Sequence, residues 1–255
     1  MSRHTHLRLD DGPSLVLTAK GVATSRVPLA RISHLVTPAG CGLHENVLLA
    51  CARRNITIVW QDKHGAPLAV LFGSNHGQPV PWAERIHAAI SRPEWNERYT
   101  SWYAAQCCMA RKSLARRCGF VGDGLRGRAW FNGLLSHIEV PRSVGMAALS
   151  EWESSALALL TEHWHAIQVP TDVMIHPAAG VNIAGDMARC LAFGMVANGL
   201  MKRREQWCRI PLSNREIVHY TAASLFERHR GEMLHLVAAF HARFHRWLLG
   251  LESWH

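Results

Sequence analysis

The 255-residue sequence lacks several features that define common classes of protein. No stretch approaches the roughly 18–20 consecutive apolar residues that a membrane-spanning helix needs. The N-terminus, Met1–His4, has no apolar signal-peptide core, so we expect a cytoplasmic protein with no membrane partner. The seven cysteines include no CxxC pair, and an odd number cannot all pair internally. They indicate reduced thiols, with a zinc site as the second alternative.

Acidic residues are scarce in two segments of the chain, and basic ones are scarce between them. The chain has 28 Lys and Arg against 19 Asp and Glu, a formal net charge of +9. Residues 84–128 and 202–246 are basic, whereas residues 139–172 hold Arg142 against five acidic residues. Two basic segments around an acidic one favour a protein that grips a polyanion beside a carboxylate site. The alternative is a basic surface that serves only solubility.

Residues 1–74 predict a β-rich domain with one short helix. Alternating and β-branched residues bounded by Gly, Pro and Asp are typical of short strands. The expected strands are residues 15–19, 22–29, 32–36, 56–60 and 67–72. Residues 45–54 have helical spacing and are expected to end at Asn55. Residues 75–81 are rich in Gly, Pro and Asn, which predicts a linker.

Residues 82–255 predict an all-helical domain, so the expected fold is α+β in two domains. The capping box Ser91–Glu94 is expected to open a helix that Gly119 ends. A second box, Ser213–Glu216, is expected to open the last helix, with a bend at Gly231. The remaining expected helices are residues 146–167 and 183–201.

Several segments occur in an order that is typical of one family. The segments are Glu45–Leu49, Asn55–Trp60, Gly65–Ala69, the helix with Gln106, Lys112 and Leu114, and the final stretch Arg230–Gly250. With a β-rich domain before a basic helical domain, the chain resembles the CRISPR-associated integrase, the endonuclease of CRISPR adaptation.

The resemblance implies a metal-dependent transesterification of DNA. A 3′-hydroxyl of a short DNA fragment attacks the backbone of a repeat array, and Mg²⁺ or Mn²⁺ neutralises the charge at the phosphate. It also implies double-stranded DNA as the partner, a homodimer formed by the β-rich domain, and a small companion adaptation protein.

The resemblance further implies three residues that would act in catalysis and hold the metal. Glu153, followed by Ser154-Ser155-Ala156, matches the Glu of the family, and His176 and Asp186 match its His and its acidic residue. Two departures stand out: His176 follows Glu153 by only 23 positions, and Arg189 stands where a second acidic residue is expected. The alternative is therefore a catalytically inactive, integrase-like scaffold that binds DNA.

Basic residues on both sides of the acidic segment are candidate contacts to DNA phosphates. The candidates are Arg111, Lys112, Arg116, Arg117, Arg126, Arg128, Lys202, Arg203 and Arg204. The competing interpretation of each is an ordinary surface charge.

Other residue groups offer competing interpretations. Glu151 and the Glu162–His165 segment could replace Glu153 as the functional part of the same helix. His241 and His245, four positions apart, could bind zinc, although no third ligand is evident. Aromatic residues between Trp95 and Tyr103 could stack on bases, but their helical spacing is more typical of a core or a dimer contact.

Overall fold

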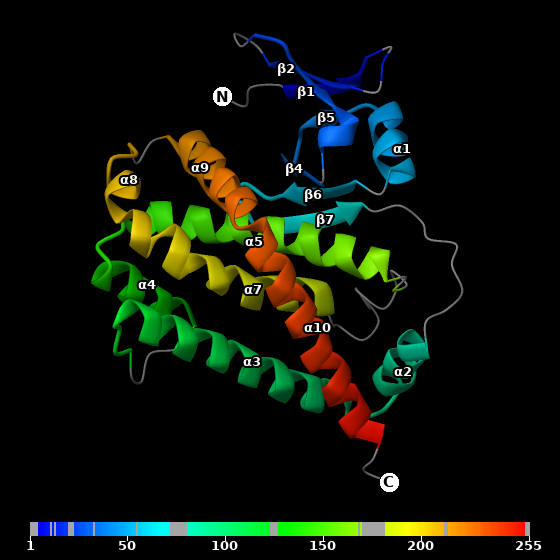
Figure 1. Ribbon diagram of the computed structural model, residues 1–255, viewed down its shortest axis with the longest axis vertical. Coiled ribbons are helices and arrows are strands. Elements are labelled where there is room, and N and C mark those ends of the chain that lie inside the picture. Colours follow the sequence, from blue (N-terminus) through cyan, green and yellow to red (C-terminus); the bar gives the residue numbers. More distant parts are fainter. Residues whose placement is uncertain are drawn as a thin grey trace.

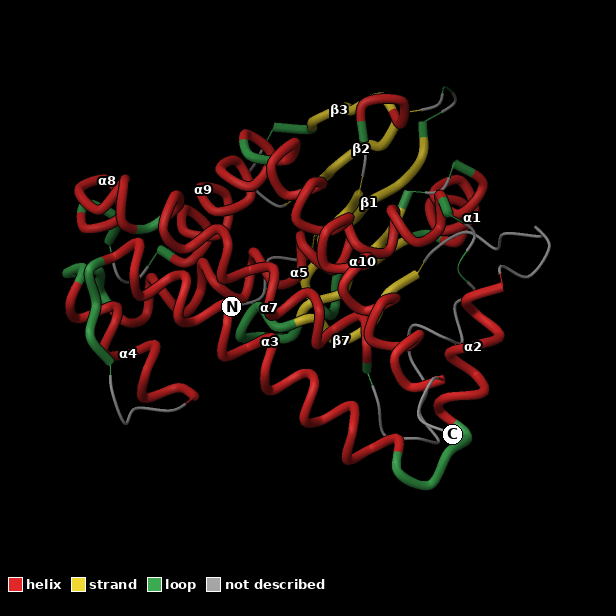
Figure 2. The backbone as a smooth tube through the Cα atoms, turned by 60° about the horizontal axis from the view of Figure 1, so that its bottom comes forward, coloured by secondary structure: helices red, strands yellow, loops and turns green. Residues whose placement is uncertain are grey.

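The structure, a computed structural model, has a strand-rich N-terminal part above an all-helical part (Figure 1). It describes residues 5–10, 12, 14–19, 23–32, 34–54, 56–71, 81–122, 127–167, 169, 182–211 and 214–252. The expected α+β fold class is confirmed. Figure 2 shows strands β1 (Thr5–Leu9), β2 (Ser14–Ala19) and β3 (Ser25–Pro28) at one edge of the molecule and helix α3 (Trp95–Cys118) toward the other.

The strand-rich part contains two sheets. In the first, the order is β3-β2-β1-β5, where β5 is Gly42–Leu43. Strands β2 and β3 pair antiparallel, as the predicted hairpin requires, and the residues expected to turn between them lie outside the described part. Strand β1, which the sequence analysis did not predict, pairs antiparallel with β2. Helix α1 (Glu45–Arg53) covers this part and ends before Asn55, which is also not described.

The second sheet joins the strand-rich part to the helices. Its strands are β4 (His34–Pro38), β6 (Thr57–Gln61) and β7 (Pro67–Leu71), in the order β4-β6-β7. Neighbouring residues of β6 point to opposite faces. Ile58 therefore enters the small core of the strand-rich part, whereas Val59 enters the large helical core. Because this sheet contributes to both cores, the predicted division after residue 74 stays a prediction.

Helix α5 (Arg142–Ala166) is the centre of the helical part, with strand β6 on one side and helix α7 (Ile183–Gly199) on another. A β-carbon at Gly199 would collide with the buried ring of Trp152, so this glycine permits the close approach of α5 and α7. The other helices are α2 (Pro81–Ile90), α4 (Gly127–His137), α8 (Arg204–Cys208), α9 (Arg215–Arg228), α10 (Arg230–Glu252) and the short 3₁₀ segments η1 (Leu29–Arg31) and η3 (Met201–Arg203).

Several helix ends differ from the predictions. The capping box at Ser91 is wrong: the Ser91 hydroxyl donates to the His87 carbonyl at the end of α2, and α3 begins at Trp95 without a side-chain cap. Gly119 does end α3, in the left-handed conformation with φ +64°. Asn214 caps α9, since its side chain accepts from the amide of Ile217.

The long C-terminal helix breaks earlier than expected. Helix α9 ends at Arg228 and α10 begins at Arg230, so the break is at His229 and not at Gly231. Among the described helices, none has the length and apolar character required to cross a membrane.

Candidate functional site

A cavity of about 950 Å³ lies between helices α3, α4, α5 and α7. In the part of the chain that the structure describes, its wall combines apolar side chains with one carboxylate, that of Glu153, and with basic side chains from three helices. The basic lining residues are Arg111, Lys112, Arg128 and Arg189. The cavity therefore places the predicted acidic residue among several of the residues predicted to bind DNA.

Helix α5 points Glu153 into this cavity. Met146, Leu149 and Glu153 all line it, as expected for residues three and four positions apart on one helix face. The Glu153 side chain is only 17% exposed. Its burial raises the pKa of the carboxyl group, and the nearby Arg189 guanidinium opposes that rise.

Asp186 lies in the first turn of α7 and reaches the same guanidinium. The side chain of Asn182 caps this helix by accepting from the amide of Gly185. Asp186 Oδ2 accepts a hydrogen bond from the Tyr99 hydroxyl at 3.1 Å. Burial raises the pKa of Asp186, although the Tyr99 hydrogen bond and Arg189 both favour the charged form.

Arg189 connects the two predicted acidic residues. Its Nε lies 3.9 Å from Glu153 Oε1, and its Nη1 lies 3.8 Å from Asp186 Oδ1. The structure thus brings Glu153 and Asp186 to one place. The third predicted member, His176, lies outside the described residues, as does the candidate DNA contact Arg126.

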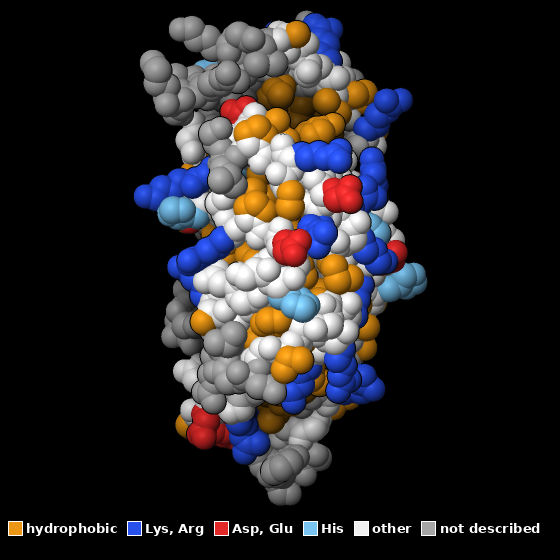
Figure 3. Space-filling model, turned by 90° about the vertical axis from the view of Figure 1, so that its left-hand side faces the viewer, with side chains coloured by type: hydrophobic (Ala, Val, Ile, Leu, Met, Phe, Trp, Pro, Cys, Tyr) orange, Lys and Arg blue, Asp and Glu red, His pale blue; other side chains and the backbone are white. Residues whose placement is uncertain are grey.

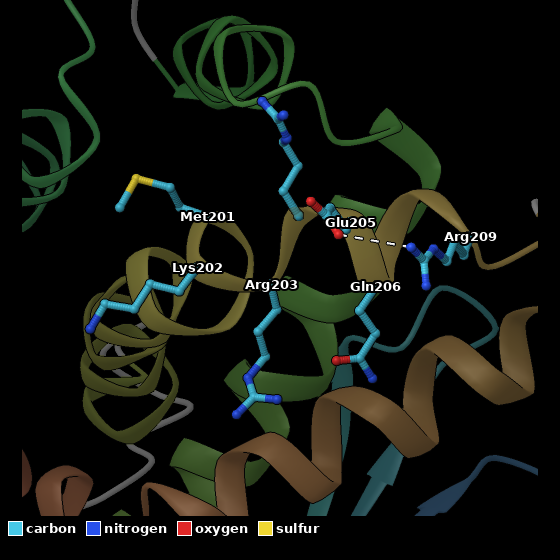
Figure 4. Close-up of a pocket in the computed structure, with 7 residues that line it drawn as sticks. Met201, Lys202, Arg203, Glu205, Gln206 and Arg209 are labelled. Carbon is cyan, nitrogen blue, oxygen red and sulfur yellow. Dashed lines mark ion pairs between the residues drawn. The ribbon is translucent and has the colours of Figure 1, made fainter.

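The other described basic candidates lie away from the cavity around Glu153. Lys202, Arg203 and Arg204 line a second cavity, of about 660 Å³, near α8. Figure 4 shows Lys202 and Arg203 pointing in different directions, while Glu205 and Arg209 form an ion pair. Arg204 is also paired, with Glu139 Oε2 at 2.9 Å. Unlike the basic side chains around Glu153, which come from three helices, these three come from consecutive residues of the chain.

The remaining two candidates lie on the exposed side of α3. Arg116 is exposed, and Arg117 donates to the Asn198 side chain at 2.9 Å. Figure 3 views the molecule from the left-hand side of Figure 1 and shows Lys and Arg side chains spread along much of that face. A role of any of these residues in DNA binding stays a prediction.

The two competing acids of α5 have other partners. The Glu151 carboxylate does not face the cavity: its Oε2 accepts from Gln61 Nε2 of β6 at 3.1 Å and from His219 Nδ1 of α9 at 2.8 Å. Glu162 pairs with Arg230. Neither acid lines the cavity around Glu153.

The histidine cluster gives the zinc alternative no support in the part of the chain that the structure describes. The rings of His163 and His241 are 5.7 Å apart, and those of His241 and His245 are 6.5 Å apart. His241 Nδ1 accepts from the Trp164 indole at 3.1 Å. Among the described residues no group of three His, Cys, Asp or Glu side chains is arranged to hold a metal.

Two features of the site were not predicted from the sequence. The first is that the buried Tyr99, on the aromatic face of α3 that packs in the core, also uses its hydroxyl to hold Asp186. In addition, the Sγ atoms of Cys107 and Cys190 lie 3.1 Å apart. Hydrogen bonds from Cys190 and Tyr103 lower the pKa of the Cys107 thiol to about 7. Helical spacing placed these side chains on α3 but gave no sign of their partners on α7.

Comparison with known proteins identifies the family that the sequence resembles. Residues 1–117 match the model of the family described as CRISPR associated protein Cas1. No curated protein matches the sequence. The resemblance to the CRISPR-associated integrase is thereby confirmed.

The fold extends this similarity to nearly the whole chain. A Cas1 protein from Thermotoga maritima is 9% identical, with a TM-score of 0.69 over 98% of this chain and 96% of that chain. A TtCas1–DNA complex is 14% identical, with a TM-score of 0.59 over 93% and 88%. A casposase bound to its integration product is 12% identical, with a TM-score of 0.57 over 89% and 80%. At such low identity these similarities establish the fold alone.

Proposed function

Taking the chain as a Cas1-type protein, we propose that it binds double-stranded DNA and joins short DNA fragments to a repeat array in CRISPR adaptation. The observation that carries the proposal is the cavity in which Glu153 lies among basic side chains from α3, α4 and α7. A wall of Arg and Lys attracts phosphates, and a buried carboxylate beside them can take part in phosphodiester chemistry.

In this proposal the cavity residues have separate roles. Arg111, Lys112 and Arg128 contact the DNA backbone, which fixes the position of the DNA without selecting its sequence. Glu153, His176 and Asp186 are the proposed catalytic residues. The more distant Lys202, Arg203 and Arg204 would contact DNA that extends beyond the cavity, as would Arg116, Arg117 and Arg126.

Mg²⁺ or Mn²⁺ is the cofactor that the family implies, and it would neutralise charge at the reacting phosphate. Carboxylate and imidazole groups are suitable ligands for these ions. However, the two described carboxylates do not form an open cation site, because the guanidinium of Arg189 lies against both. This arrangement favours a second candidate function, a DNA-binding scaffold that does not catalyse joining.

One assay separates the two functions. A short labelled duplex is incubated with supercoiled DNA that carries a repeat, in the presence of Mn²⁺ or Mg²⁺. The enzyme joins the duplex to the repeat, and Glu153→Gln lowers joining at least about a hundredfold, as for other losses of charge stabilisation at a reaction centre. Glu162→Gln, on the same helix but outside the cavity, is the matched control and retains joining.

Two other outcomes would contradict the proposal at different levels. Tight, salt-sensitive DNA binding without joining or nicking would remove the enzyme and leave the scaffold. No detectable affinity for duplex DNA at about 0.1 M salt would remove both functions, since phosphate contacts still contribute there.

The proposal also includes a homodimer and a small companion adaptation protein. Strand β3 is at the edge of its sheet, and all four of its residues are exposed. An exposed edge strand offers unpaired backbone donors and acceptors, which supports an interface on the strand-rich part. Light scattering on the purified protein is expected to give twice the 28.5 kDa mass of one chain. A mass of one chain would contradict the dimer.

A further inference from the structure

The side chain of Arg189 touches groups from three helices. It pairs with Glu153 of α5 and with Asp186 of α7, at 3.9 Å and 3.8 Å. Its Nη1 also donates to the Tyr103 hydroxyl of α3, at 3.3 Å. A guanidinium is planar and always charged, so one Arg side chain can serve several acceptors at once.

The position of this cation matters because both carboxylates are partly withdrawn from water. The side chains of Glu153 and Asp186 are 17% and 22% exposed, and the Arg189 guanidinium gives each of them a positively charged neighbour. The Arg189 side chain is 54% exposed and lines the cavity. Arg189 is therefore more open to solvent than either of the carboxylates that it pairs with.

A divalent cation would meet two obstacles at this pair. Mg²⁺ requires carboxylate oxygens at about 2.0–2.1 Å, and Glu153 and Asp186 would have to turn from the guanidinium toward it. The positive charge of Arg189, within 4 Å of both carboxylates, would also repel the ion. In this arrangement Glu153 and Asp186 are already paired with a positively charged side chain of the protein, that of Arg189.

We infer that Arg189 is the resident counter-ion of Glu153 and Asp186 and competes with divalent metal for this carboxylate pair. The inference rests on the proposed function only in taking the pair as its reactive centre. Arg189 is thus a positioning residue: its ion pairs orient both carboxylates, and its hydrogen bond to Tyr103 holds the guanidinium in place. The free protein consequently has a low affinity for Mg²⁺ and Mn²⁺ at this pair.

The test is Mn²⁺ binding, followed by the electron paramagnetic resonance signal of free Mn²⁺ as the full-length protein is titrated. Arg189→Gln is expected to bind Mn²⁺ at least about tenfold more tightly than the wild type, the size of effect seen for groups that tune a metal site. Arg189→Met, which keeps the apolar stem of the side chain, is expected to show the same gain. The double variant Glu153→Gln/Arg189→Gln is expected to lose it.

Arg128→Gln is the matched control, because it removes a positive charge from the same cavity and Arg128 lies outside the ion pairs of Glu153 and Asp186. Its Mn²⁺ affinity is expected to stay within about twofold of the wild type, since an exposed charge that is paired with neither carboxylate is screened by solvent and salt. The inference is overturned if Arg189→Gln and Arg189→Met, shown by circular dichroism to be folded, gain no affinity, or if Arg128→Gln gains as much. Joining of DNA by the wild type is measured separately, so either proposal can fail alone.

Discussion

Two of the carboxylates of helix α5, only two positions apart, lie in opposite surroundings. On one face, which we call the closed face, Glu151 is 5% exposed and has two hydrogen-bond partners, Gln61 and His219. On the cavity face, Glu153 lines an open space and has a half-exposed arginine as its neighbour. Both groups are largely buried, yet only one of them can be reached by a ligand.

The comparison shows what separates a structural carboxylate from a candidate reactive one. Ser154, also on the closed face, donates to the carbonyl of Gly65 and so joins the same helix to the strand-rich part. Hydrogen-bonded polar groups in a dry interface fix how two parts of a protein fit together. Glu153 contributes little to such a fit and instead gives the cavity its negative charge. Four predictions test this difference, from the largest expected effect to the smallest.

The largest effect is expected from Glu151→Ala. It leaves the buried Gln61 amide without its acceptor, which costs about 1–3 kcal/mol, and it also removes the hydrogen bond of the partly exposed His219 ring. We expect urea denaturation to show a loss of about 2–4 kcal/mol in the free energy of unfolding. Glu153→Ala is the matched variant and should change it by less than about 1 kcal/mol, because its ion pair is partly exposed to solvent. Equal losses would remove the distinction between the two faces.

Acid should lower the free energy of unfolding through His34, a residue of strand β4 that lies near Glu151 and the helices α9 and α10. Burial, with the nearby Arg230, lowers the pKa of His34 from 6.5 to about 4, against an opposing effect of Glu151; Glu227 also lies 3.7 Å away. Between pH 6.5 and pH 4 the unfolded chain binds the proton and the folded chain does not, so stability is complete above pH 6.5 and declines below it. The decline approaches about 1.4 kcal/mol per pH unit.

Urea denaturation between pH 7 and pH 4.5 measures this decline. His34→Asn removes the titrating group and should make the dependence of the unfolding free energy on pH shallower. The same dependence in wild type and variant would show that His34 carries no part of the acid sensitivity.

Replacing a glycine by alanine adds one methyl group, and two glycines with positive φ allow this change to be compared near the closed face and at the cavity. Gly65, with φ +86°, lies against Ser150 and His219, at 3.1 Å and 3.0 Å from an added β-carbon. Gly127, with φ +54°, lines the cavity and has open space around it. Gly65→Ala should destabilise by about 1–3 kcal/mol through backbone strain and crowding, and Gly127→Ala by less, through strain alone. Thermal unfolding measures both, and a larger loss for Gly127→Ala would contradict the packing described.

The smallest effect concerns access to the cavity. The Cys107 thiol lines it, and its pKa is lowered to about 7. Iodoacetamide should therefore modify Cys107 at neutral pH, whereas burial and a raised pKa protect Cys51 in the small core of the strand-rich part. Peptide mass spectrometry after brief alkylation measures both sites. Faster modification of Cys51 would contradict the contrast in access.

Local patterns predicted much of the fold but not its contacts. The strands after Ile56 and Pro67 and the end of α3 at Gly119 follow from β-branched residues and from the freedom of glycine to adopt positive φ. Strand β1 was missed although Leu7 and Leu9 alternate with polar residues, because it is short and has one strongly polar face. Ser91 begins a sequence typical of a capping box for α3, but its hydroxyl instead donates to the His87 carbonyl at the end of α2.

For the site, the sequence could name Glu153 and Asp186 but could not reveal their neighbours. Their approach depends on the packing of α5 on α7, which Gly199 permits at the far end of that helix. The sequence could not tell which of Glu151 and Glu153 faces the cavity, because that depends on the direction in which each side chain points. Arg189 appeared in the sequence as a departure from the family pattern, and the structure gives that departure a position between the two carboxylates.

The central claim is that duplex DNA binds at the cavity around Glu153, and the salt dependence of duplex affinity tests it most directly. The variant Arg111→Gln/Lys112→Gln/Arg128→Gln is compared with Arg31→Gln/Arg53→Gln/Arg54→Gln, which removes the same charge from exposed residues of the strand-rich part. If each cavity residue contacts a phosphate, the slope of log affinity against log salt should fall by about 2.7 in the cavity variant. The control should keep the slope of the wild type. Equal slopes in the two variants, or an unchanged slope in the cavity variant, would contradict the account.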